Sequence, residues 1–256
     1  MPPVSPQSTA SPDDQTAGAT ATSAVGRNLI LRAIPAEEYA RLLPHLEPFA
    51  LEPMQLLAEL GDPIPHVYFP ETGIVSLLSR LADGTLIENG TVGSEGMAGL
   101  PLLLGVDWTP VLMTGQVPGL SRRVDAATFR ALLPTLPVLE TILRRYVVYF
   151  LAQVSQSLAC NTAHTVEQRC ARWLLMTHDR VPGDQFVLTH EVLAQMLAVR
   201  RAGVSVAADA MRTRGLIQYS RGRITITDRA GLEAAACECY GIVRRQRDAL
   251  VGPMAG

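Results

Sequence analysis

The chain has 256 residues, of which 48% are hydrophobic and 5% aromatic, so it is long enough for one large domain or two ordinary ones with aliphatic cores. Its formal net charge is -2, but residues 1–162 contain nine arginines and fifteen acidic residues, whereas residues 163–256 contain thirteen arginines and nine acidic residues. The basic C-terminal part favours a nucleic-acid-binding module, and no apolar run approaches the roughly 20 residues of a membrane span, so we expect a cytoplasmic protein that does not enter a membrane.

Residues 1–27 are rich in Ser, Thr, Ala, Pro and Gly without periodicity, which predicts a disordered tail. Residues 28–135 are broken at short intervals by Gly and Pro, and Asp83-Gly84 between two β-like runs is a strong signal for a hairpin turn. Many short strands joined by turns predict a jelly-roll-type β-barrel, flanked by helices at Pro35–Leu46 and Ala126–Leu133. The expected strands are His66–Phe69, Ile74–Leu81, Thr85–Thr91, Val111–Val117 and Leu120–Val124.

Residues 136–160 have a different pattern, with one apolar residue at alternating four- and three-residue steps. The repeating positions are Leu139, Leu143, Tyr146, Phe150, Val154 and Leu158. This spacing predicts an α-helix with a single apolar stripe of the coiled-coil kind. The stripe packs either on the chain's own barrel or on a second copy of the chain. Because the helix bridges two predicted domains and has few local partners, we favour a dimerisation helix.

Residues 161–240 contain the pattern of a helix-turn-helix. Thr189 is suited to cap a short helix, and Ala198-Val199 follows as a turn. A second helix is expected from Arg200 to Arg214, and Gly215 ends it as a C-terminal glycine does. Two short helices that cross in this way are the helix-turn-helix unit of DNA-binding proteins.

A predicted β-hairpin after the second helix makes this unit a winged helix. Its strands are Gln218–Arg221 and Arg223–Thr227, and they turn at Gly222. The two arginines beside this glycine suit a DNA phosphate. The remaining residues, 241–256, are assigned to a C-terminal tail.

The start of the second helix carries Arg200 and Arg201, where helix-turn-helix proteins contact base edges in the major groove. Arginine forms bidentate hydrogen bonds with guanine and with phosphate. The sequence therefore predicts a DNA-reading surface made of this helix start and the wing.

With these elements in place, the chain resembles the CRP/FNR family of bacterial transcription regulators. Leu188–Asp228 looks like the family's DNA-binding domain, and His66–Gly73 with Gly93–Gly99 is similar to its cyclic-nucleotide-binding-like barrel. The resemblance implies an α+β protein with an N-terminal jelly-roll-type β-barrel, a long dimerisation helix and a C-terminal winged helix-turn-helix. It implies double-stranded DNA and a second copy of the chain as partners, with RNA polymerase as a further candidate.

The resemblance also assigns roles within the winged helix. Arg201 occupies the position of the family's base-reading arginine, while Ala202 and Val206 stand where an acidic residue and a second arginine are common. The target sequence should therefore differ from the best-known family site. The expected DNA-contacting residues are Thr189, Arg200, Arg201, Ala202, Ser205, Val206, Arg221 and Arg223, with phosphate contacts from Thr189, Arg200 and Ser205.

The barrel departs from the family pattern. Ser94-Glu95 stands for the Gly-Glu pair that binds the ribose in nucleotide-binding members, and it marks the expected effector pocket. The segment Val106–Met113, where the family places an arginine for the cyclic phosphate, contains none. A buried phosphate without a cation is poorly compensated, so we expect no cyclic-nucleotide binding of the usual kind.

No cofactor is expected. The cysteines are Cys160, Cys170, Cys237 and Cys239. They form no C-x-x-C pair and have no histidine cluster nearby, and the N-terminal cysteine set of the family's iron–sulfur members is missing, so neither a zinc site nor an iron–sulfur cluster is predicted. We expect reduced thiols, and assign no chemistry to His164 or His178.

These features predict a homodimeric, sequence-specific DNA-binding transcription regulator that binds an inverted repeat and carries a divergent effector domain. The alternative is a small-molecule-binding module whose winged helix contacts proteins. An enzyme is not expected, because the sequence shows neither clustered metal ligands nor a nucleophile spaced to meet a base.

Overall fold

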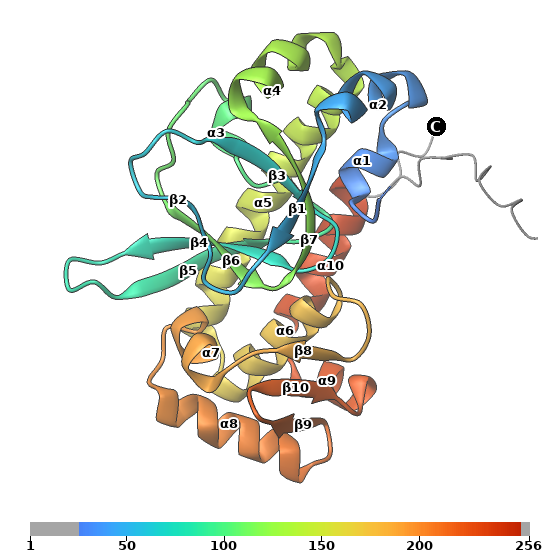
Figure 1. Ribbon diagram of the computed structural model, residues 1–256. Coiled ribbons are helices and arrows are strands. Elements are labelled where there is room, and N and C mark those ends of the chain that lie inside the picture. Colours follow the sequence, from blue (N-terminus) through green and yellow to red (C-terminus); the bar gives the residue numbers. More distant parts are fainter. Residues whose placement is uncertain (1–25, 252–256) are drawn as a thin grey trace, which may run out of the picture.

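The computed structural model describes residues 26–251 (Figure 1). The predicted disordered tail, 1–27, lies outside the described residues except at its last two positions, and residues 252–256 lie outside them as well. The described chain has a β-rich N-terminal domain, a long helix beside it and a C-terminal domain of helices with a small sheet (Figure 1). This is the predicted α+β architecture.

The N-terminal domain contains two antiparallel sheets. One has three strands in the order β1-β7-β3, and the other has four in the order β2-β6-β4-β5. The strands are β1 (Glu47–Leu51), β2 (Leu56–Ala58), β3 (His66–Pro70), β4 (Ile74–Arg80), β5 (Leu86–Val92), β6 (Leu112–Val117) and β7 (Gly119–Asp125). The five predicted strands agree with β3–β7 to within one residue at every end. The predictions missed β1 and β2, which contain little alternation of apolar and polar residues.

Short helices close this domain. They are α1 (Leu29–Ala33), α2 (Ala36–Leu42), the 3-10 helix η1 (Leu43–His45), α3 (Leu100–Leu103), α4 (Ala126–Leu132) and the 3-10 helix η2 (Leu133–Thr135). Asn28 caps α1 with its Oδ1 and donates its Nδ2 to the carbonyls of Pro70 and Gly96, which ties α1 to the barrel. The helix predicted at Pro35–Leu46 is divided into α2 and η1, because Pro44 has no N–H to continue the α-helix.

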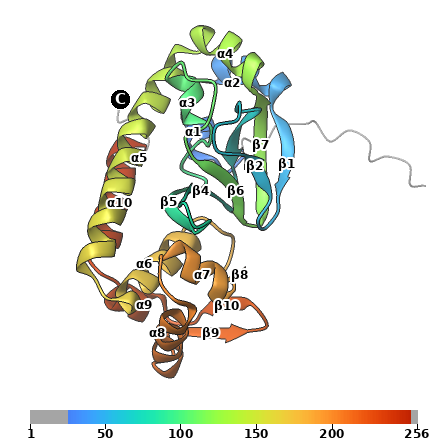
Figure 2. The same cartoon turned by 90° about the vertical axis from the view of Figure 1, so that its left-hand side faces the viewer.

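The long helix α5 (Pro137–Ala163) packs one side on the barrel (Figure 2). Leu139, Leu143 and Tyr146 are fully buried within the chain itself. The prediction that the whole stripe faces a second copy was therefore wrong for these three residues, which follow the alternative of packing on the chain's own barrel. Periodicity shows that a stripe is buried, but it does not identify the surface that buries it.

The C-terminal domain is a winged helix. Its elements are α6 (Val166–His178), β8 (Gln185–Val187), α7 (His190–Met196), α8 (Arg201–Thr213), β9 (Ile217–Ser220), β10 (Arg223–Ile226) and α9 (Arg229–Ala235). Thr165 and Gln168 form a capping box at the start of α6. Gly215, at φ 73°, follows α8 as predicted. The wing hairpin gains a third strand, because β10 pairs with both β9 and β8.

The C-terminal segment differs from the prediction. Residues 241–256 were assigned to a tail, but α10 (Cys239–Leu250) is a helix that lies alongside α5 (Figure 2). Val243 and Val251 are buried in the same core as the inner face of α5, and Arg145 Nη2 donates to the carbonyl of Ala249 at 3.0 Å. The helix was missed because its exposed face is rich in arginine and only a few side chains form its buried stripe.

Among the described residues, no single helix is both long and apolar enough to cross a membrane. One bent pair, Ala126–Thr135 and Pro137–Ala163 at 112°, passes the criterion by length and composition alone.

Candidate nucleic-acid interface and the domain interface beside it

The two helices of the helix-turn-helix are held by local signals in the sequence. Thr189 Oγ1 accepts a hydrogen bond from the backbone N–H of Val192, which confirms it as the cap of α7. The turn passes through Ala198, at φ 50°, and Val199 N–H donates to the carbonyl of Ala194. Ala194 is buried, so α7 and α8 pack closely at a small side chain. The buried face of α8 consists of Val204, Ala207, Ala208 and Met211, as the sequence predicts.

The predicted DNA-contacting residues lie on the outside of α7, α8 and the wing. Seven of them are exposed, namely Thr189, Arg200, Arg201, Ala202, Val206, Arg221 and Arg223. Within residues 26–251, the four arginines among them form no ion pair. Val206 is an aliphatic side chain that is 71% exposed. We call these residues, with the half-buried Ser205, the recognition surface.

The wing turn is built for a tight hairpin. Arg221 and Gly222 have φ values of 49° and 74°, and two positive φ values at the centre of a two-residue turn are typical of type I′ hairpins. The carbonyl of Gly222 accepts from Leu188 N–H at 2.9 Å, so the wing is tied to the start of α7. The wing and the helix pair therefore present one continuous surface.

His190 joins the same three elements, and the sequence analysis did not identify it. Its Nδ1 lies 3.1 Å from the hydroxyl of Ser205 on α8, and its ring stacks on Tyr219 of β9 with the centroids 4.3 Å apart. Burial, followed by the positive charge of Arg201, lowers the pKa of His190. A neutral imidazole at this position fixes α8 against the wing without adding a charge. The fold alone brings Tyr219 to it, so no local pattern revealed the role.

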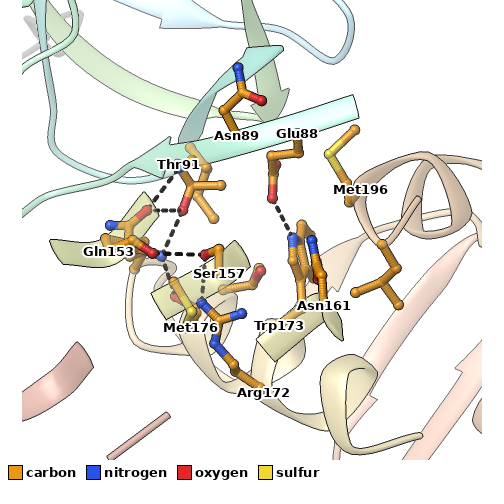
Figure 3. Close-up of a pocket in the computed structure, with 15 residues that line it drawn as sticks. Glu88, Asn89, Thr91, Gln153, Ser157, Asn161, Arg172, Trp173, Met176 and Met196 are labelled. Atoms are coloured by element: carbon orange, nitrogen blue, oxygen red, sulfur yellow. Dashed lines mark hydrogen bonds between the residues drawn. The ribbon is translucent and has the colours of Figure 1, made fainter. Parts of the chain in front are cut away.

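The C-terminal domain is also packed against the four-stranded sheet of the barrel. Trp173 Nε1 donates to Glu88 at 3.0 Å (Figure 3). Ser76 Oγ donates to the same carboxyl group at 2.6 Å. Burial is the largest effect on Glu88 and raises its pKa to about 7. Ile74 and Leu78 of β4 share an apolar core with α6 and α7.

A second contact between the domains is a buried ion pair. Arg180, just after α6, donates from Nε and Nη2 to the carboxylate of Glu95, and the Nη2–Oε1 distance is 2.6 Å. The two side chains are 6% and 3% exposed. Burial alone would raise the pKa of Glu95, but the charge of Arg180 and its hydrogen bonds hold it below its usual value. We call Glu88, Trp173, Glu95 and Arg180 the domain interface.

The predicted effector pocket at Ser94 and Glu95 lies at this ion pair between the domains. Glu95 binds Arg180, and the carbonyl of Ser94 accepts from Leu29 N–H at 2.6 Å. A cavity of about 380 Å³ lies at this position, lined by Ser94, Glu95 and Arg180 together with Arg27, Arg32 and Arg247. A second cavity, of about 390 Å³, lies between the barrel and α5. Its lining is almost wholly apolar, and Asn89 and Thr109 are its polar members.

The fold also brings a histidine next to one of the cysteines. The sequence predicts no histidine cluster near them, and in the structure one histidine, His164, places its Nδ1 3.7 Å from Cys239 Sγ. These residues are far apart in the sequence and meet because α10 returns along α5 (Figure 2).

The fold defines a protein with a β-barrel joined by a long helix to a winged helix, a domain type that commonly binds DNA. The exposed arginines lie on that winged helix. Residues 168–235 match the family described as the Crp-like helix-turn-helix domain. No match was found among curated proteins.

Solved structures of CRP/FNR regulators resemble most of the described chain. FixK2 from Bradyrhizobium japonicum has a TM-score of 0.64 and 16% identity, covering 75% of this chain and 98% of its own. A CRP-family transcriptional regulator from Thermus thermophilus has a TM-score of 0.60 and 21% identity, with 73% and 96% covered. CLP, a c-di-GMP-responsive global regulator from Xanthomonas campestris, has a TM-score of 0.58 and 18% identity, with 75% and 99% covered.

The protein therefore carries a Crp-like helix-turn-helix domain and has the fold of the CRP/FNR regulators, which confirms the resemblance seen in the sequence.

Proposed function

We propose that this protein is a sequence-specific DNA-binding transcription regulator that acts as a homodimer on an inverted repeat. The observation that carries the proposal is the recognition surface, where four arginines without an ion pair among the described residues lie exposed on a Crp-like helix-turn-helix and its wing. A surface of this charge and shape matches the phosphates and base edges of a DNA major groove.

The side chains at the start of α8 have different roles in this proposal. Arg200 and Arg201 enter the major groove, and Arg201 is the chief base-reading residue. The exposed methyl groups of Val206 and the small Ala202 suit apolar contact with a thymine methyl, which gives this protein a target sequence of its own.

The remaining residues of the recognition surface contact the DNA backbone. Arg221 and Arg223 bind phosphates from the wing, and Thr189 does so from the start of α7. Ser205 is half-buried beside His190, but a hydroxyl can accept from the imidazole and donate to a phosphate at the same time.

The homodimer is supported by the face of α5 that the barrel leaves uncovered. Val148, Leu151 and Leu158 are 54%, 61% and 71% exposed. Together with exposed Ser155 they follow three- and four-residue steps, the spacing of a coiled-coil seam. If a second copy packs along this seam, the dimer carries two copies of α8. Each α8 then reads one half-site of the DNA, and the two half-sites lie about 34 Å apart.

This dimer is tested by the mass of the protein in solution. Leu151→Glu places a charge in the seam and should give a monomer in size-exclusion chromatography with light scattering. Leu120→Glu, at a β7 side chain that is 58% exposed, is the matched control and should leave the dimer intact. A wild-type monomer, or a dimer in both variants, would contradict the proposed interface.

The effector domain is divergent in this proposal. The apolar cavity offers no cation among its lining residues, and in the cavity at Ser94 the carboxylate of Glu95 is already paired with Arg180. We therefore infer that the barrel does not bind a cyclic nucleotide in the usual way. A thermal-shift titration with cyclic AMP and cyclic GMP should show no saturable stabilisation, and saturable micromolar binding would overturn this inference.

The proposed function is tested by selection from random double-stranded DNA with the wild-type protein and Arg201→Ala. The wild type should recover an inverted repeat, and Arg201→Ala should relax the sequence at one position of each half-site. Arg212→Ala, farther along α8 and paired with Asp209, is the control and should recover the wild-type repeat. Recovery of no palindrome, with weak binding to all sequences, would favour the alternative in which the winged helix contacts proteins.

A cytoplasmic location and a contact with RNA polymerase follow from this proposal and remain predictions.

A further inference from the structure

Four side chains with metal-ligating atoms meet where the end of α5 touches the start of α10. Cys160 lies in the last turn of α5 and His164 is its C-cap, one helical turn further on, while Cys239 is the first residue of α10 and Cys237 comes two residues before it. One ligand atom from each of the four residues lies within 4.8 Å of the other three. The three cysteines are buried, and they form a core cluster of their own.

Two of the distances between these atoms match those of a tetrahedral zinc site. Zinc binds sulfur at about 2.3 Å and nitrogen at about 2.0–2.1 Å, so tetrahedral geometry separates the ligand atoms by about 3.5–3.8 Å. Cys160 Sγ and Cys237 Sγ are 3.5 Å apart, and Cys239 Sγ and His164 Nδ1 are 3.7 Å apart. Three cysteines and one histidine are among the usual ligand sets of structural zinc.

The orientation of His164 gives a second, independent observation. Its Nδ1 faces the cysteines, while its Nε2 lies 3.2 Å from a carboxylate oxygen of Glu238. A histidine that ligates a metal usually donates its other ring N–H to a carboxylate, which fixes the tautomer. Gln156 Nε2 also donates to Cys239 Sγ at 3.0 Å, as an outer hydrogen bond to a sulfur ligand does.

The surrounding charge suits a site of this composition. Three thiolates, one neutral imidazole and one Zn²⁺ ion have a net charge of -1, and Arg169 and Arg172 on α6 contribute positive charge at the cluster. Arg169 in turn donates to the carbonyl of Leu197 at the helix-turn-helix turn, so the cluster adjoins the DNA-binding unit.

A simple disulfide explains less of the arrangement. Cys160 and Cys237 are near enough to be oxidised to one, but that bond leaves Cys239 without a partner and gives no reason for the imidazole to point at the sulfurs. A shared metal ion accounts for all four residues.

We propose that Cys160, His164, Cys237 and Cys239 bind a structural zinc ion that fastens α10 to the end of α5. Binding deprotonates the three thiols, so one Zn²⁺ ion is taken up and three protons are released. Because all four positions are filled by protein, the site is closed and stabilises the junction where the long helix passes into the DNA-binding domain.

The experiment is a metal analysis of the full-length protein, purified with a reductant and without a chelator. Mass spectrometry of the metal content should give about one zinc per chain for the wild type, as a closed four-ligand site holds one ion. Cys239→Ser and His164→Ala should each reduce this value to a small fraction. Cys170→Ser is the matched control, because Cys170 is a buried cysteine in a different core, and it should retain the zinc.

A second measurement does not depend on how the variants fold. Metal-stripped wild-type protein is titrated with Co²⁺, which should give thiolate-to-cobalt charge transfer and the absorption of tetrahedral cobalt at one equivalent. Wild-type protein that binds neither zinc nor cobalt would overturn the proposal. So would zinc retained equally in Cys239→Ser and His164→Ala, or a Cys160–Cys237 disulfide in reductant-free protein that takes up no metal after reduction.

Discussion

Arginine has opposite surroundings in two regions of this molecule. On the recognition surface, Arg200, Arg201, Arg221 and Arg223 are exposed and have no acidic partner among the described residues. At the domain interface, Arg180 is buried and binds Glu95 through several hydrogen bonds. A buried charge needs a partner within the chain, whereas an exposed one stays available to an external anion. Burial, and not residue type, therefore separates the arginines that hold the domains together from those proposed to bind DNA.

The largest effect is expected at the domain interface. Arg180→Ala leaves the carboxylate of Glu95 buried without its cation, and loss of one partner of a buried pair costs about 3–5 kcal/mol. Urea unfolding should show this loss. Arg212→Ala removes an exposed pair with Asp209 and should change the free energy of unfolding by less than about 1 kcal/mol. Equal effects of the two substitutions would contradict the distinction between buried and exposed arginines.

The next effect concerns pH and Glu88. Its pKa is about 7 in the folded protein and 4.5 in the free carboxyl group, so protonated Glu88 favours the packed domains. This contribution is complete below pH 4.5 and is lost as the pH rises to about 7. A shift of this size corresponds to roughly 3 kcal/mol, and the opposing charges of Arg180 and Arg172 are already part of it.

Glu88→Gln keeps the shape and removes the titration. The free energy of unfolding, measured by urea titration across this pH range, should fall less steeply with pH in the variant than in the wild type. Glu140→Gln changes an exposed carboxylate paired with Arg144 and should keep the wild-type slope. Parallel profiles for Glu88→Gln and the wild type would show that this carboxyl group does not titrate at the interface.

On the recognition surface, Arg201→Ala should leave the fold intact and weaken binding to the selected DNA site. Loss of a bidentate contact to guanine costs about 1–3 kcal/mol, or about 5- to 150-fold in the dissociation constant. Fluorescence anisotropy with the selected site measures this change. The thermal unfolding midpoint of Arg201→Ala is the control. A large drop in this midpoint would mean that Arg201 has a structural role and not a DNA-binding one.

The smallest effect is expected at the wing. Arg221→Ala should weaken binding to selected and scrambled DNA by the same factor, because a phosphate contact does not depend on the base sequence. The dependence of the logarithm of the binding constant on the logarithm of salt concentration should become shallower by about one. A sequence-dependent loss would assign Arg221 a base contact.

The recognition surface was predictable because its signals are local. The cap at Thr189, the glycine after α8 and the Arg-Gly turn of the wing each depend on a few neighbouring residues, and the structure places all three as the sequence indicated. The hairpin at Asp83-Gly84 and strands β3–β7 were found for the same reason.

The domain interface was not predictable, since its partners are distant in sequence. Glu95 and Arg180 are separated by 85 residues, so no local pattern could pair them. The packing of α10 on α5, and with it the meeting of Cys239 and His164, also depends on the complete fold. The stripe on α5 is buried on the barrel at Leu139, Leu143 and Tyr146, whereas Leu158 at its far end is exposed, because the surface that covers each residue depends on where the barrel closes.

The most direct test of the proposed function compares two DNA duplexes at one salt concentration. One carries the inverted repeat recovered by selection, and the other carries the same bases scrambled. The wild-type protein should bind the repeat on the order of 10³-fold more tightly or better, and Arg201→Ala should lose most of its affinity for the repeat while binding the scrambled duplex as before. Equal affinity of the wild-type protein for both duplexes would contradict sequence-specific recognition by this winged helix.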